Sequence, residues 1–440
     1  MRRIILFWLQ LVFALQAASE VTAFSQDDGC GESQTLTLDE CQRLARENYP
    51  LIRRYELLEQ TKQFTLSNIQ KGWMPQVSFS VQATYQSDVV ALPEALENMM
   101  AQYGKEVVGI KKDQYRVSLD VQQTIYDGGV VRSRKGVAEA QTEAEKSKND
   151  VDMYALRERV NSLYFMILLL DEKIALSVEM QQSLQANEDK LSEMVKGGTA
   201  MECDMNSVRA ERLTVRQEQT RLEEQRAAVR QVLGVFVGRD VTDVVKPEFV
   251  SGEVGQGARR PELTYFDRQI GLTQQQEEAL KSGLTPKLVF FAQGYYGYPG
   301  MNMYEDMFSH KWSLNGLIGA RLTWNMSSLY TNKNDKRKLE SQRQEIETQR
   351  ETFMFNQRMQ TTQERGAIES YRKMLQEDDE IIELREGVRQ SAEAKLRLGT
   401  VDVSGLVQEI TRESQAKINK SVHEIELLQH IYNLKYITNE

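Results

Sequence analysis

Two stretches of this 440-residue chain are each long enough to form a single helix that is longer than a compact domain is wide. The first covers 130–196, which contains no proline, and the second covers about 330–398. At 1.5 Å per residue, the first helix would be about 100 Å long. Its apolar residues recur three and four positions apart, which is the spacing of a coiled-coil seam. This seam consists of Met153, Leu156, Val160, Leu163, Ile167, Leu170 and Ile174.

Each long helix is predicted to end in a glycine turn that leads into another helix, over 202–237 and 403–437. Glycine just past a helix end supplies the left-handed residue that caps the last turn. Each pair of helices is therefore expected to form a hairpin whose tip is the glycine turn. The tip residues are Gly197, Gly198 and Thr199 in the first hairpin and Gly399 and Thr400 in the second.

Four other segments alternate between apolar and polar residues, as strands of a membrane barrel do when one face contacts lipid and the other a lumen. They cover 77–86, 115–125, 287–296 and 314–324. The third is less regular, because apolar residues share one of its faces with lysine and glutamine. Five aromatic residues near the strand ends suit a girdle at the membrane surfaces. They are Tyr295, Tyr296, Tyr298, Trp312 and Trp324.

The order helix, strand, strand, long helix, tip and helix occurs twice, which indicates an internal duplication. We expect a first repeat over 26–240, a linker over 241–261 and a second repeat over 262–440. Residues 1–25 have the basic start, short apolar stretch and small-residue exit of a secretory signal peptide. The chain is therefore predicted to be exported.

Composition excludes some classes of function. The net charge of −9 argues against a nucleic-acid binder, whose footprint would be basic. Three cysteines are too few for a disulfide framework, although pairing of Cys30 with Cys41 stays open. His423 and His430, seven apart on a helix, are interpreted as a surface pair, because a metal site needs more ligands. No catalytic, cofactor or metal constellation stands out, so no enzyme activity is predicted.

Four strands are too few to close a membrane barrel, which needs at least eight. Open strand edges are not tolerated in lipid. Either several chains share one barrel or the strands are not in the membrane. Three chains would supply twelve strands, with the helices continuing as a tube. The alternative is a periplasmic coiled-coil scaffold or adaptor that never enters the membrane.

At this point the sequence resembles the TolC family of outer-membrane efflux proteins over nearly all of the exported chain. The helix start at 36–41, the Gly-Trp-Met-Pro junction at 72–75 and the Tyr-Asp-Gly-Gly turn at 126–129 carry the resemblance. Each motif alone is weakly specific, whereas their order and repetition are specific.

The resemblance implies a mixed α and β fold: a homotrimer with a twelve-stranded transmembrane β-barrel, four strands per chain, continued by an α-helical tunnel through the periplasm. It implies a passive channel in the outer membrane of a Gram-negative bacterium, serving a tripartite efflux or type I secretion system. The implied partners are a periplasmic adaptor (membrane fusion) protein, an inner-membrane pump and outer-membrane lipid. The pump is either of the resistance-nodulation-division class or ATP-driven.

In the family, acidic residues just past the hairpin tips constrict the periplasmic aperture, and the tips dock the adaptor. Asp204 matches the family's acidic position in the first repeat, and Glu202 lies beside it. The corresponding second-repeat position is Gly405, so this chain departs from the family pattern there. Asp402 and Glu409 are the nearby carboxylates that can substitute. Glu202 and Asp204 also suit a purely structural role, because acids in the first turn stabilise a helix.

Overall fold

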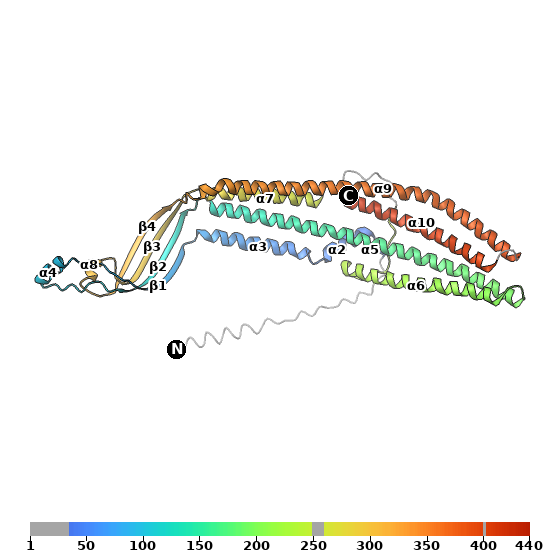
Figure 1. The fold of residues 1–440 in the computed structure, drawn as a ribbon, viewed down its shortest axis with the longest axis horizontal. Coiled ribbons are helices and arrows are strands. Elements are labelled where there is room, and N and C mark those ends of the chain that lie inside the picture. The colour runs from blue at the N-terminus through green and yellow to red at the C-terminus, as the bar shows by residue number, and fades with distance from the viewer. Residues whose placement is uncertain (1–34, 249–258, 399–401) are drawn as a thin grey trace, which may run out of the picture.

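In the computed structural model, which describes residues 35–248, 259–398 and 402–440, a four-stranded sheet forms one end of an elongated molecule (Figure 1). The sheet is antiparallel in the order β1-β2-β3-β4, which leaves β1 and β4 at its edges. Its strands are β1 (Gln76–Tyr85), β2 (Asp113–Tyr126), β3 (Lys287–Tyr298) and β4 (Ser313–Thr323). The strand connections contain the short helices α4 (Glu94–Gln102) and α8 (Met303–Asp306), at the end away from the long helices.

The strand register divides the sheet into an apolar face and a polar face. Val77, Val121, Ala292 and Ile318 pair in one continuous row across all four strands. Val77 is 63% exposed and Ile318 is 73% exposed, so this apolar face is uncovered in a single chain. Such a face is what a strand presents to lipid.

The opposite face carries the hydrogen-bonded polar side chains. The hydroxyls of Ser80 and Ser118 lie 2.7 Å apart, and Gln293 Nε2 donates to Asp120 Oδ1. Asp120 pairs with Gln293, whose strand neighbour on the same face, Phe291, pairs with Gln122. The register therefore explains the irregular third strand, because its lysine, valine and phenylalanine share the polar face.

Part of the predicted aromatic girdle is wrong. Trp312 is exposed beside Tyr296, but Tyr295 and Tyr298 are each only 4% exposed. Tyr295 lies on the polar face, where the guanidinium of Arg116 is 4.2 Å from the centre of its ring. Tyr298 packs in a small cluster under the strand connections. The position of Tyr295 is determined by strand alternation, and that of Tyr298 by the loops that cover it, so neither ring belongs to a girdle.

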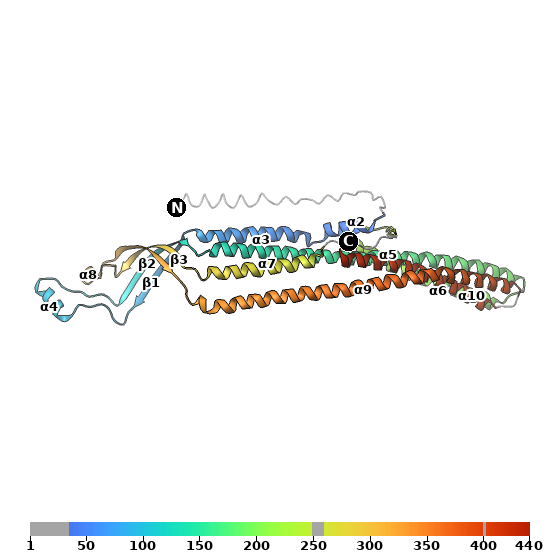
Figure 2. The same cartoon turned by 90° about the horizontal axis from the view of Figure 1, so that it is seen from above.

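The helices form a layer of four neighbours in each half of the helical part. Near the sheet the order is α3, α5, α7 and α9, with α3 and α9 at the two edges (Figure 2). Away from the sheet α6 contacts α5, α5 contacts α10, and α10 contacts α9. The bounds are α2 (Leu38–Asn48), α3 (Ile52–Gln70), η1 (Lys71–Trp73), α5 (Val130–Lys196), α6 (Glu202–Val237), α7 (Pro261–Ser282), α9 (Ser328–Arg397) and α10 (Val403–Thr438).

The largest apolar core lies where α2, α5, α6 and α10 meet, about half-way along the molecule. Tyr164 is fully buried there, and its hydroxyl lies 2.9 Å from the carbonyl oxygen of Leu36. The carbonyl oxygen of Val245 is equally within hydrogen-bond reach of this hydroxyl. Cys41 is buried in the same core, and burial raises the pKa of its thiol to about 11. This core packs the segments around Leu36 and Val245 against the middle of α5.

A second core joins the two hairpins near their tips. Leu184, Leu191 and Val208 come from the first hairpin, and Leu406 and Ile410 come from the second. Because these residues pack in one cluster, the two tips lie at the same end of the molecule (Figure 1).

The interpretation of the two histidines as a surface pair is wrong. His423 Nδ1 lies 2.7 Å from Asp378 Oδ2, and His430 Nδ1 lies 2.6 Å from Glu364 Oε2. Tyr371 of α9 packs against both imidazole rings. Both histidines therefore belong to the contact between α9 and α10, where α9 supplies acidic partners seven residues on either side of Tyr371.

Within the part of the chain that the structure describes, no helix is both long and apolar enough to cross a membrane. The predicted signal peptide over 1–25 lies outside the described residues, as do Cys30, Gly399 and Thr400. The pairing of Cys30 with Cys41 and the geometry of the second tip turn therefore stay predictions.

Candidate functional site

The first hairpin tip is a tightly hydrogen-bonded glycine turn. Gly198 has φ of +72°, a left-handed conformation that glycine adopts without steric cost. The N–H groups of Gly198 and Thr199 donate to the carbonyls of Val195 and Met194, at 3.0 and 2.9 Å. These bonds satisfy carbonyls at the end of α5 that have no partner within the helix. The chain can therefore reverse direction sharply and begin α6 at Glu202.

Two of the predicted tip carboxylates stabilise helix starts. Asp402 accepts a hydrogen bond of 3.0 Å from the N–H of Gly405 at the start of α10. Asp204 accepts one of 3.2 Å from the N–H of Met201 at the start of α6. Carboxylates at a helix N-terminus pair with free N–H groups and with the positive end of the helix dipole. Both residues therefore hold the shape of the tip.

Glu409, on the second turn of α10, is held by two arginines. Its Oε1 lies 2.6 Å from Arg412 on the same helix, and its Oε2 lies 3.7 Å from Arg385 on α9. The side chain of Glu409 is 15% exposed. Its charge is thus balanced within the second hairpin, where it connects α9 and α10.

Glu202 differs from the other three carboxylates. Its side chain is exposed on the first turn of α6, and it makes no hydrogen bond or ion pair with any residue that the structure describes. It is followed by Cys203, which is also exposed. Among the four predicted aperture residues, Glu202 alone keeps an unpaired negative charge at the tip.

A charged seam that the sequence analysis missed connects the two hairpins. Lys417 of α10 makes ion pairs with Glu179 of α5 and with Glu413 of its own helix, the latter at 3.2 Å. Glu413, only 9% exposed, also pairs with Arg389 of α9. Burial lowers the pKa of Lys417, but its two carboxylate partners raise it above its ordinary value overall. The spacing of Glu413 and Lys417, four apart on one helix, was the visible signal.

Comparison with known proteins agrees with this architecture. Residues 42–239 match the sequence model of the family described as outer membrane efflux protein. No curated protein sequence matches the chain.

Solved structures of outer-membrane channels share the fold. The outer-membrane channel OprN is 13% identical, with a TM-score of 0.67 over 91% of this chain and 89% of that chain. The outer membrane protein VceC from Vibrio cholerae is 12% identical, with a TM-score of 0.66 over 91% of this chain and 95% of that chain. The CmeC outer membrane channel from Campylobacter jejuni is 11% identical, with a TM-score of 0.63 over 91% of this chain and 85% of that chain.

The predicted fold class is confirmed, because a four-stranded antiparallel sheet continued by long helical hairpins is the fold of these channels. The chain is thus similar in fold to outer-membrane channels over 91% of its length. Over residues 42–239, which are fewer than half of the chain, the sequence is similar to the outer membrane efflux protein family.

Proposed function

We propose that three copies of the chain form one passive export channel, in which their twelve strands close a barrel in the outer membrane. The observation that carries this proposal is the pair of open edges, β1 and β4, on a sheet whose apolar face is uncovered. Unpaired strand edges are too costly in lipid to persist. Pairing β4 of one copy with β1 of the next removes every edge.

The dimensions of the sheet fit the membrane. Ten residues of β1 extend about 33 Å, and a tilt of about 45° reduces that to about 23 Å along the membrane normal. The apolar band of outer-membrane barrels is about 25 Å tall. The four strands are therefore long enough to cross the outer membrane.

The helical part supports the same arrangement. Its edge helices near the sheet carry exposed apolar side chains, including Leu57 (59% exposed) and Phe64 (68%) on α3, and Phe355 (61%) on α9. Packing α3 of one copy against α9 of the next would bury these residues and extend the barrel as a helical tunnel. Burial of apolar surface favours such association at about 25 cal/mol per Å².

The channel would be the outer component of a tripartite efflux or type I secretion system and would pass small molecules or proteins. It has no energy source of its own, so an inner-membrane pump, either of the resistance-nodulation-division class or ATP-driven, would supply the energy. A periplasmic adaptor would dock at the hairpin tips, on Gly197, Gly198, Thr199, Gly399 and Thr400.

We place the periplasmic aperture at the same tips. Threefold symmetry would gather three copies of Glu202, Asp204, Asp402 and Glu409 around the axis. Like charges gathered at a narrow opening attract cations and repel one another. Because the other three carboxylates are engaged within the chain, Glu202 would determine the cation preference of the aperture.

The oligomeric state tests the proposal directly. The mature protein would be extracted from membranes, run in detergent with and without boiling, and weighed as an intact particle. We expect a trimer that requires detergent and dissociates on heating. A water-soluble monomer or dimer would contradict the channel and favour a periplasmic scaffold.

The aperture is tested by the reversal potential of single channels in a planar bilayer. Replacing Glu202→Gln removes three charges from the trimer and should lower the ratio of cation to anion permeability at least two- to five-fold, because each charge is worth about 0.5–1 kcal/mol at 4–8 Å in water. The matched control is Glu224→Gln, an exposed and unpaired carboxylate further along α6. Equal permeability ratios in the two variants would show that Glu202 is not at the aperture.

A further inference from the structure

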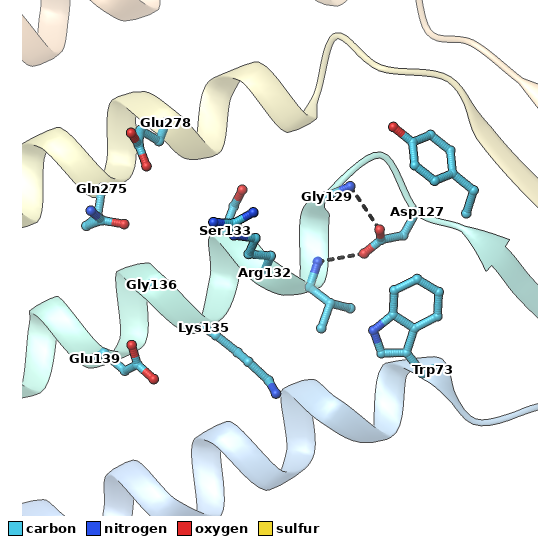
Figure 3. A pocket seen from close by; sticks show the side chains of 12 residues that line it. Trp73, Asp127, Gly129, Arg132, Ser133, Lys135, Gly136, Glu139, Gln275 and Glu278 are labelled. Carbon is cyan, nitrogen blue, oxygen red and sulfur yellow. Dashed lines mark hydrogen bonds between the residues drawn. The ribbon is translucent and has the colours of Figure 1, made fainter.

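A cavity of about 820 Å³ opens where the sheet meets the helices, between the end of β2, the start of α5 and α7 (Figure 3). Trp73 and Tyr126 line the end of this cavity nearest the strands. Arg132 and Lys135 of α5 line its middle, and Glu139 of α5 lines the end furthest from the strands. Glu278 of α7 also lines the cavity, on the other side of α5 from Glu139 in this view. Aromatic, basic and acidic side chains therefore follow one another away from the sheet.

The register of the sheet places this cavity on the outer surface of the molecule. A bulge between Thr124 and Tyr126 lets Tyr126 pair with Leu288. Leu288 is four residues from Ala292 along β3 and so lies on the apolar, lipid-facing side. Since Tyr126 lines the cavity, the cavity opens on the side that faces lipid and not on the lumen side.

The depth of the two basic residues matches the headgroup layer of a membrane. The polar layer on each side of a bilayer is about 5–8 Å thick. Arg132 and Lys135 lie two and five residues after the first residue of α5, about 3 and about 8 Å along the helix axis. Trp73 and Tyr126, at the sheet end, are the residue types that mark the membrane surface.

The two basic side chains are available to a ligand. Arg132 and Lys135 are three residues apart on α5, and both line the cavity. Neither makes an ion pair or side-chain hydrogen bond with any residue that the structure describes, although Glu139 is only four residues from Lys135. The nearby Asp127 is engaged instead, because it accepts the N–H groups of Gly129 at 2.9 Å and Val131 at 2.7 Å.

We propose that this cavity binds the headgroup of a phospholipid from the periplasmic leaflet, with the phosphate on Arg132 and Lys135. Arginine and lysine are the usual phosphate donors. Glu139 and Glu278, the acidic side chains of the lining, attract a headgroup ammonium, so the preferred lipid carries a primary amine, as phosphatidylethanolamine does. The site depends on the outer-membrane location of the sheet and is independent of the pump that the channel serves.

Lipid retention measured by native mass spectrometry tests this site. The purified full-length protein would be mixed with equal amounts of phosphatidylethanolamine, phosphatidylglycerol and phosphatidylcholine, and bound lipids would be counted per chain. We expect about one phosphatidylethanolamine per chain in excess of the other lipids. Arg132→Gln combined with Lys135→Gln should lower this retention at least tenfold.

The control is Arg134→Gln, which removes one positive charge from the same turn of α5 and lines a different groove, between α5, α7 and α9. Retention equal in the control and in the double variant would overturn the proposal. Displacement of the lipid by millimolar inorganic phosphate would also overturn it, because the site would then be a solution anion site.

A second pair of variants keeps the test independent of folding. Glu139→Gln with Glu278→Gln leaves the phosphate contacts in place and should remove the preference for phosphatidylethanolamine over phosphatidylglycerol. An unchanged preference would contradict the assignment of the ammonium. The heat-sensitive oligomer is measured on each variant, so loss of assembly is distinguished from loss of lipid.

Discussion

Arg260 connects four helices at the middle of the molecule. It precedes α7, is 7% exposed and pairs with Glu262 through an Nε–Oε2 contact of 2.9 Å. It also donates to the carbonyl of Tyr436 at the end of α10, at 3.1 Å. The rings of Tyr154 on α5 and Phe353 on α9 lie 4.8 and 5.5 Å from its guanidinium carbon. Burial lowers the pKa of Arg260, but the pair with Glu262 raises it above its ordinary value overall.

We expect Arg260→Gln to weaken this joint by about 3–5 kcal/mol. Removing one member of a buried ion pair leaves the other charge without compensation, which costs about that amount. The side chain of Glu262 is only 15% exposed, so water can replace little of the lost interaction. At 1.4 kcal/mol for each factor of ten, local opening of the joint should become at least about 100-fold more frequent.

Hydrogen–deuterium exchange measures this opening directly, because local openings govern the exchange of buried amides. Peptides from the first turns of α7 and the last turns of α10 should exchange at least about 100-fold faster in Arg260→Gln. Arg259→Gln is the matched control, since its pair with Asp267 is exposed (51% and 39%) and worth about 0–1 kcal/mol.

The double replacement of Arg260 and Glu262 by glutamine separates the ion pair from simple loss of packing. With no uncompensated charge left, its exchange should return to within about tenfold of the native protein. The reasoning is refuted if Arg260→Gln exchanges as slowly as the Arg259→Gln control. It is also refuted if the double replacement exchanges as fast as Arg260→Gln.

Three further outcomes follow from single side chains. Lys146 holds the pKa of Glu59 at about 2, below its ordinary 4.5. The stabilisation by ionised Glu59 is therefore complete above about pH 4.5 and is lost as the pH falls toward 2. In thermal melts, Glu59→Gln should lose less stability over this range than the native protein. Cys41, whose thiol is buried with a raised pKa, should resist iodoacetamide at pH 8 while the exposed Cys203 reacts, as measured by peptide mass. Tyr164→Phe should lower the free energy of unfolding by about 0.5–1.5 kcal/mol, since the carbonyl oxygens of Leu36 and Val245 lose the hydroxyl that they share, whereas Leu36 keeps the N–H of Val245 as a donor; an unchanged thermal midpoint would contradict this.

Local patterns predicted the elements that depend on local spacing. The heptad-like seam from Met153 to Ile174 indicates α5, and all of its residues except the half-buried Leu163 are buried where the helix packs, because a period of three and four places them on one face. Period-two alternation likewise predicts the strands, since one face must meet lipid. The left-handed turn at Gly198 was readable from glycine chemistry alone.

Contacts between distant segments could not be predicted from these patterns. The ion pair of Lys417 with Glu179 joins residues 238 positions apart, and no periodicity specifies which acid on another helix faces a given lysine. The bulge after Thr124 moves Tyr126 to the other face of the sheet, although simple alternation assigns it to the polar face. The burial of Tyr298 depends on loop residues that carry no periodic signal.

The pairing state of each charged group indicates whether it serves the single chain or something beyond it. Asp402, Asp204 and Glu409 are engaged in helix caps or ion pairs, so they are satisfied before any assembly forms. Glu202 at the tip and the two cations of the junction cavity have no partner among the described residues. An exposed, unpaired charge contributes little to the stability of one chain. Because the unpaired groups lie at the two ends of the helical part, their partners in the proposed channel are expected at the periplasmic opening and at the membrane surface.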